Sequence, residues 1–167
     1  MYTSINTFAL DWTQEKMLTQ KLLDALTDEC LNQPVSIGGR TLGRIAWHMV
    51  TDVSIFLRHF GLDVHEVVDV NNVPSSATVI ADVFRVMSAE GLKAVTEQWT
   101  DDTLQEVQDA FGRELTNGTI LGLLVKHTIH HRGQITVLMR QAGLQVPGMY
   151  GPSKEEWSLR GQEPPSI

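Results

Sequence analysis

Apolar residues recur every three or four positions along most of this chain, and this period limits the possible folds more than any other feature. Such spacing places apolar side chains on one face of an α-helix. It predicts helices over residues 7–31, 42–60, 79–99 and 117–142, with one short helix around Trp157. No segment alternates apolar and polar residues over a useful strand length. The expected fold is therefore all-α, with four amphipathic helices packed as a four-helix bundle.

Small polar residues, glycine and proline mark the ends of these helices. Ser, Thr and Asn are typical N-caps, whereas Gly commonly follows the last turn. The expected caps and stops are Thr41, Gly61, Ser75, Ser76 or Thr78, Thr116 or Asn117, Gly143 and Ser153. Residues 100–115 have no strong period, so we expect a loop or a short irregular excursion there.

The length of 167 residues fits one domain with a proper core. We expect a single domain over residues 1–160, followed by a C-terminal tail over residues 161–167. The formal net charge of −7 repels phosphate backbones and argues against nucleic acid as a partner. A small-molecule ligand agrees better with this charge.

Cys30 is the single cysteine of the sequence, so no intrachain disulfide and no thiolate metal cluster can form. A lone cysteine on an apolar stripe is expected to pack in the core rather than act as a nucleophile. The first residues show no basic leader, and no stretch approaches the roughly 20 apolar residues that span a bilayer. We therefore expect a cytoplasmic protein without membrane contact.

His127 and His131, in the run HTIHHRGQ, lie one helical turn apart on the same face. They continue the apolar stripe of the fourth helix, so both rings are expected to face the core. An unsatisfied buried polar group costs about 1–3 kcal/mol, and a metal ion would satisfy both rings at once. Core histidines with ordinary hydrogen-bond partners are the alternative interpretation.

His48 lies at the edge of the apolar stripe of the second helix and can turn inward as a third ligand. Three histidines from two facing helices would leave at least one coordination position for water or substrate. Asp52, one turn beyond His48, could accept a hydrogen bond from a ligand ring, bind the metal itself or be an exposed acid. Of these roles for Asp52, the exposed acid is slightly favoured.

Other polar residues have several possible roles. Arg132 and Gln134 flank His131 and could orient a substrate, bind a carboxylate or make contacts between helices. His130 points about 100° away from His131, and His59 is roughly 16 Å along the helix from His48. These two residues and His65 are expected at the surface.

A lone inward histidine in the second helix, followed by an H-x-x-x-H-R-G-Q motif in the last long helix, resembles the DinB/YfiT-like superfamily over nearly the whole chain. The run HTIHHRGQITVLMRQAGLQVPGMYGPSKEEW is especially similar to DinB-type proteins of Gram-positive bacteria. The resemblance implies an antiparallel four-helix bundle of the DinB/YfiT-like metalloenzyme fold. It also implies a divalent metal (nickel, zinc or iron) bound by His48, His127 and His131, and a homodimer.

Better-characterised relatives in this superfamily are thiol-dependent enzymes, in which the metal activates a low-molecular-weight thiol such as bacillithiol or mycothiol. The resemblance therefore implies a metal-dependent transferase or hydrolase that acts on a small molecule. A non-catalytic, stress-associated bundle that binds a metal or another ligand is the second hypothesis. A helical module that binds a protein partner through an exposed apolar face is the third.

Overall fold

The computed structural model describes residues 1–67 and 69–166. Four long helices form the body of the molecule: α1 (Ile5–Leu23), α2 (Leu42–His59), α3 (Ala77–Gln98) and α4 (Asn117–Gln141). Smaller elements are the 3-10 helices η1 (Glu29–Asn32) and η2 (Thr103–Gln105), the strands β1 (Val107–Asp109) and β2 (Glu114–Thr116), and helix α5 (Lys154–Leu159). The predicted all-α helical bundle is confirmed.

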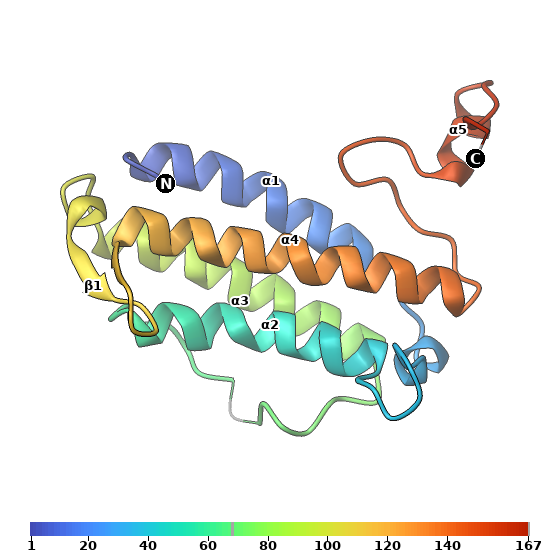
Figure 1. Cartoon of the computed structure of the whole chain (residues 1–167), viewed down its shortest axis with the longest axis horizontal. Coiled ribbons are helices and arrows are strands. Elements are labelled where there is room, and N and C mark those ends of the chain that lie inside the picture. The colour runs from blue at the N-terminus through green and yellow to red at the C-terminus, as the bar shows by residue number, and fades with distance from the viewer. Residues whose placement is uncertain (68, 167) are drawn as a thin grey trace.

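Two of the long helices run in each direction (Figure 1). Helix α1 packs against α3 and α2 packs against α4, each pair in opposite directions. Helices α2 and α3 run the same way, because the connection between them returns along the whole length of the bundle (Figure 1). This order places the middle of α2 beside the middle of α4, where the candidate ligands lie.

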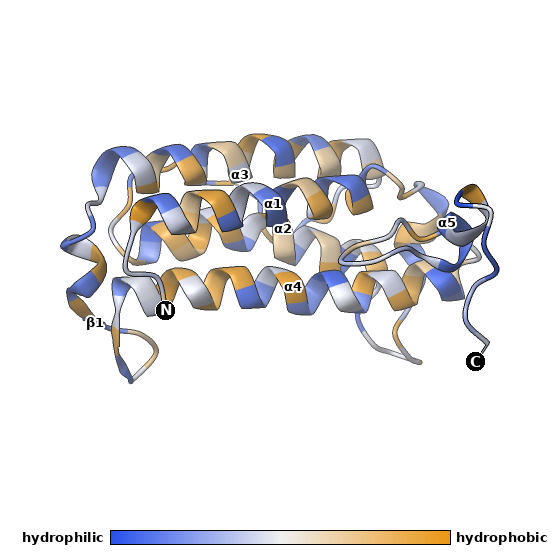
Figure 2. Cartoon of the chain, turned by 90° about the horizontal axis from the view of Figure 1, so that it is seen from above, coloured by the Kyte–Doolittle hydropathy of each residue, from blue (hydrophilic) through white to orange (hydrophobic). Residues whose placement is uncertain are grey.

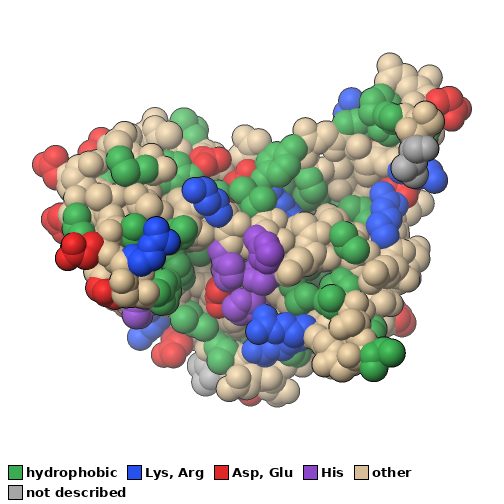
Figure 3. Space-filling model, viewed as in Figure 1, with side chains coloured by type: hydrophobic (Ala, Val, Ile, Leu, Met, Phe, Trp, Pro, Cys, Tyr) green, Lys and Arg blue, Asp and Glu red, His purple; other side chains and the backbone are tan. Residues whose placement is uncertain are grey.

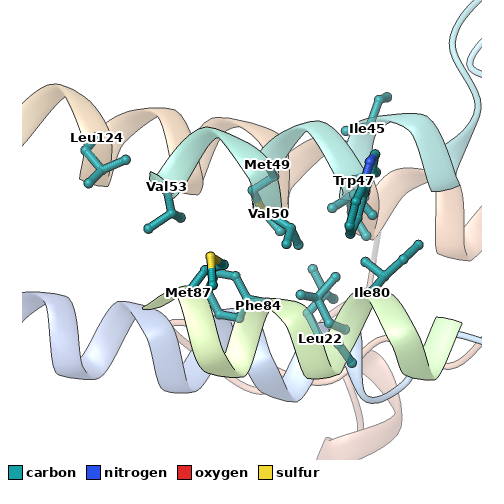
Figure 4. Packing of buried hydrophobic residues seen from close by; sticks show 14 of the residues in the cluster. Leu22, Ile45, Trp47, Met49, Val50, Val53, Ile80, Phe84, Met87 and Leu124 are labelled. Carbon is teal, nitrogen blue, oxygen red and sulfur yellow. The ribbon is translucent and has the colours of Figure 1, made fainter. Parts of the chain in front are cut away.

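The core consists of aliphatic and aromatic side chains from all four long helices. In Figure 4, Val50 and Val53 of α2 point toward Phe84 and Met87 of α3, and Leu22 of α1 lies close by. Each long helix carries both hydrophobic and hydrophilic residues along its length (Figure 2), as the period predicts. Cys30 is buried in this core, and its thiol donates to the Thr27 carbonyl over 3.0 Å. The expectation of a packing role for this cysteine agrees with that position.

The first helix is shorter than predicted, because α1 ends at Leu23 and a turn separates it from η1. Leu26 and Cys30 remain buried, so the apolar period continues through the break. The Asp28 carboxylate in this segment accepts a 2.7 Å hydrogen bond from the Ala77 N–H at the start of α3. The break therefore supplies an acceptor for a free N–H at another helix's N-terminus.

The segment 100–115 contains η2 and a two-stranded antiparallel hairpin, where we expected a loop or an irregular excursion. Each strand has three residues, which is too short for a sequence period to show. Phe111 and Gly112 form the turn with φ of 58° and 80°. The expectation of a loop or an irregular excursion was wrong for this part of the segment.

The expected helix caps agree well with the structure. The Thr41 hydroxyl accepts from the Arg44 N–H, and the Thr116 hydroxyl accepts from the Thr119 N–H. Ser153 precedes the short helix α5, and its N–H donates to the Glu156 carboxylate. Across residues 1–67 and 69–166, none of the helices is both long and apolar enough to cross a membrane.

Candidate metal centre

His48 of α2 and the pair His127 and His131 of α4 lie together where these two helices pack. One possible ligand atom from each residue lies within 4.8 Å of the other two. The Nε2 atoms of His127 and His131 are 2.8 Å apart, and the ring centroid of His48 is 4.8 Å from that of His131. The structure thus brings together the three residues that the sequence suggested.

The three rings differ in burial. His131 is 6% exposed, whereas the side chains of His48 and His127 are 27% and 35% exposed. The expectation that both rings of the α4 pair lie in the core was therefore correct for His131 only, because His127 sits at the edge of the seam with α2. Figure 3 shows histidine side chains gathered at the surface in the middle of one face. A small molecule can reach such a site from solvent.

Asp52 lies between the rings and contacts two of them. Its Oδ1 is 3.2 Å from Nδ1 of His48, and its Oδ2 is 3.1 Å from Nδ1 of His127. Burial alone would raise the pKa of Asp52, but the hydrogen bonds from His127 and His48 hold it well below its usual value. The interpretation of Asp52 as an exposed helical acid was therefore wrong.

Gln134 contacts the third ring. Its Oε1 lies 2.7 Å from Nδ1 of His131, and because a carbonyl oxygen can only accept, the ring nitrogen donates. Burial lowers the pKa of His131 to about 4, with smaller contributions from the other histidines and an opposing one from Gln134. His131 is therefore neutral at pH 7, the form that binds metals.

The donor set fits a divalent cation. With Nδ1 protons directed at Asp52 and Gln134, the Nε2 atoms of His127 and His131 present lone pairs to each other across 2.8 Å. Two lone pairs at this distance repel, and either a metal ion bound by both nitrogens or a proton shared between the two rings removes the repulsion. Neutral imidazoles are good ligands for zinc, nickel, copper and iron, and three of them leave a coordination position open.

Arg132 does not join this site, although it follows His131 directly. It is 2% exposed and points to α1, where Nη1 donates to the Glu15 carbonyl and to the Thr19 hydroxyl, each over 3.1 Å. Its Nη2 donates to the Glu15 carboxylate, and it also contacts the Tyr150 hydroxyl. Of the roles considered, carboxylate binding and contact between helices both apply, but within the protein itself.

The remaining histidines lie outside the cluster, as expected. His130 is exposed on α4. His59 stacks on Phe111 of the hairpin with centroids 5.5 Å apart, and the Nδ1 of His65 lies 3.0 Å from the Glu90 carboxylate. Trp47, which precedes the candidate ligand His48 in the sequence, is buried, and its indole N–H donates to the Asp69 carbonyl.

Fold and site together define a class of protein: a four-helix bundle with a cluster of three histidines between two of its helices. The DinB family model matches residues 1–165, and the chain belongs to the DinB family. The Bacillus subtilis protein YrdA is 46% identical over 167 residues, which cover the whole of both chains.

Two solved structures are similar to this fold. The crystal structure of a DinB-like protein from Bacillus cereus has a TM-score of 0.86 and 47% identity, covering 90% of this chain and all of the other. A DinB-like protein from Bacillus subtilis, YjoA, has a TM-score of 0.66 at 20% identity, covering 86% of this chain and 96% of the other. The second similarity concerns the fold alone.

Proposed function

We propose that this protein binds one divalent metal ion through His48, His127 and His131, and that it is a metal-dependent enzyme acting on a small molecule. The convergence of three ring nitrogens within 4.8 Å carries this proposal. Asp52 and Gln134 contact the opposite ring nitrogens, which keeps the Nε2 atoms available as ligands. Nickel, zinc and iron are the candidate ions, because imidazole suits all three.

The open coordination position is the place for the reacting group. A bound divalent ion lowers the pKa of a coordinated thiol or water, and so supplies a nucleophile at neutral pH. The histidines serve as ligands in this scheme and not as acids or bases. Asp52 and Gln134 contact the Nδ1 atoms of the rings, so neither is placed to act as a general base on the substrate. This favours a reaction of transferase or hydrolase type in which the coordinated thiol or water is itself the nucleophile.

A non-catalytic metal-binding or ligand-binding bundle is the second candidate. General acid–base catalysis requires a side chain within hydrogen-bond reach of the substrate. Asp52 and Gln134 contact ring nitrogens instead, which agrees with a protein that binds without catalysis. The two candidates differ in one measurement. An enzyme converts a small electrophile in the presence of metal and a low-molecular-weight thiol or water, whereas a binding protein leaves it unchanged.

Metal binding is tested first on the full chain. The protein is stripped with a chelator and titrated separately with Ni²⁺, Zn²⁺ and Fe²⁺, and the bound ion is counted by elemental analysis. We expect one ion per chain in the wild type and strong loss of binding in His131→Ala. The matched control is His130→Ala, which removes an exposed histidine from the neighbouring position of the same helix. Equal binding by wild type and His131→Ala would contradict the proposed ligand set.

The thiol is tested on the metal-loaded protein. A small thiol that occupies the open position of a Co²⁺- or Ni²⁺-loaded site should add a thiolate-to-metal charge-transfer band to the absorption spectrum. The band should be absent in His131→Ala. A metal-loaded protein with no such band, which nevertheless hydrolyses activated esters or amides, would identify water as the nucleophile and a hydrolase.

A further inference from the structure

Each of the three histidines at the site has an acceptor oxygen close to its Nδ1 atom, and for two of them this oxygen belongs to the same residue. Oδ1 of Asp52 lies 3.2 Å from Nδ1 of His48, and Oδ2 lies 3.1 Å from Nδ1 of His127. The amide oxygen of Gln134 accepts from Nδ1 of His131 over 2.7 Å. All three acceptor oxygens therefore contact Nδ1 and leave the Nε2 atoms free, and those of His127 and His131 lie 2.8 Å apart.

We infer that Asp52 and Gln134 are positioning residues, which hold all three histidines as Nδ1–H tautomers with the Nε2 lone pairs directed at one point. This inference rests on the proposed metal site and adds the residues that prepare it. An ionised carboxylate has no hydrogen to donate, so both rings that contact Asp52 have to donate through Nδ1. The neutral imidazole then carries its lone pair on Nε2, the atom available to a metal.

The shared carboxylate also couples two helices. Asp52 and His48 lie one turn apart on α2, whereas His127 belongs to α4. Because one side chain contacts both rings, the spacing between the His48 and His127 nitrogens is set before any ion arrives. Both oxygens of Asp52 face Nδ1 atoms, and the group of possible ligand atoms within 4.8 Å of one another consists of His48, His127 and His131, so we assign Asp52 a supporting role behind the ligands.

The charge of the site agrees with this arrangement. Three neutral imidazoles bring no charge to a divalent cation, and the Asp52 carboxylate supplies one negative charge next to two of the rings. A carboxylate that accepts from a ligand imidazole also increases the basicity of that ring. Asp52 thus affects both the direction and the donor strength of His48 and His127.

Substitution of Asp52 separates its acceptor role from packing. Asn has nearly the shape of Asp but offers one acceptor oxygen and one NH₂ donor. The NH₂ group would force one of the two rings to carry its proton on Nε2, which blocks that ligand. We expect Zn²⁺ affinity to fall about 10- to 100-fold in Asp52→Asn, and at least as far as in Asp52→Ala. If Asp52 only filled space, Asp52→Asn would bind much more tightly than Asp52→Ala.

Gln134 provides the second test, at His131. Gln134→Leu removes the acceptor and should weaken Zn²⁺ binding by about tenfold or more, whereas Gln134→Glu keeps an acceptor and should retain affinity. The matched controls are Asp102→Asn, an exposed acid between α3 and the hairpin, and Gln141→Leu at the exposed end of α4. Both controls should bind Zn²⁺ like the wild type. Thermal unfolding of each metal-free variant verifies that it is folded.

The tautomers themselves are visible by NMR. Long-range ¹H–¹⁵N spectra of the metal-free protein should show the proton of His48 and of His127 on Nδ1, and in Asp52→Asn at least one of these rings should change to Nε2–H. Unchanged Zn²⁺ affinity and unchanged tautomers in both Asp52→Asn and Gln134→Leu would overturn the inference while leaving the metal site intact. A wild type that binds no metal would instead contradict the proposed function, and the tautomer spectra would still decide the roles of Asp52 and Gln134.

Discussion

Arg132 of α4 and Glu15 of α1 form an ion pair in the interior of the bundle, where their side chains are 2% and 5% exposed. Tyr150 joins the pair from the C-terminal segment, where its hydroxyl lies 2.7 Å from the Glu15 carboxylate. Arg132 also lies over the Tyr150 ring, 5.1 Å from its centroid. One buried group of charges therefore connects two helices and the segment that follows α4.

Loss of one partner of this ion pair should destabilise the protein strongly. Arg132→Met leaves the Glu15 carboxylate buried without its cation, and we expect the free energy of unfolding in urea to fall by about 3–5 kcal/mol. The double variant Arg132→Met, Glu15→Leu should regain most of that loss, because it removes both charges. The control is Arg85→Met, whose exposed ion pair with Asp24 should contribute less than about 1 kcal/mol. Equal effects of the two single Arg variants would contradict this account.

Gly118 and Gly133 of α4 should respond in opposite ways to alanine. A Cβ atom on Gly118 would lie 1.8 Å from the Tyr2 carbonyl oxygen, whereas a Cβ atom on Gly133 meets nothing within 4 Å. Gly118→Ala has to displace the N-terminal segment and should lower stability by about 1–3 kcal/mol. Gly133→Ala should raise it by up to about 1 kcal/mol through helix propensity. Thermal unfolding of both variants tests the contrast, and destabilisation by Gly133→Ala would contradict it.

The two tyrosines should ionise only at unusually high pH in the folded protein. Burial, together with the hydrogen bond to Glu15, raises the pKa of Tyr150 to about 12. Burial and the hydrogen bond to Asp11 raise the pKa of Tyr2 even further. The unfolded chain releases these protons near pH 10. The folded state thus binds more protons between pH 10 and 12, and its stability falls as the pH rises through that range.

Absorbance at 295 nm tests this prediction directly, because the sequence has only Tyr2 and Tyr150 as phenols. In guanidinium chloride both should ionise near pH 10, whereas the native protein should show little change at that pH. Tyr150→Phe should leave a single transition, that of Tyr2. A native transition near pH 10 that accounts for both groups would show that neither phenol is protected.

A bound metal ion should stabilise the fold. Because the ion binds the folded site, Zn²⁺ at about 100 times its dissociation constant should raise the free energy of unfolding by about 2.7 kcal/mol. For a domain of this size the melting temperature should rise by roughly 5–10 °C. The increase should disappear in His131→Ala and persist in His130→Ala. A similar increase in both variants would indicate that the ion binds elsewhere.

The sequence alone predicted the helices well, because their signals are local. Thr41 and Thr116 are the N-caps of α2 and α4, and the apolar period extends through both helices. The break after Leu23 was missed, since Leu26 and Cys30 continue the same period across it. The hairpin was missed because strands of three residues have no measurable period.

The sequence also determined which histidines could meet: the separation of His127 and His131 is one helical turn, and His48 lies at the edge of the apolar stripe of another helix. It did not determine what lies behind the rings. Asp52 reaches His127 only because α2 packs against α4, and Arg132 finds Glu15 at a separation of 117 residues. Helix period and caps act between neighbours in the chain, whereas hydrogen-bond partners across a bundle depend on how the helices rotate and slide against one another. Only the tertiary structure decides that, and with it the difference between an exposed acid and a carboxylate that holds two rings.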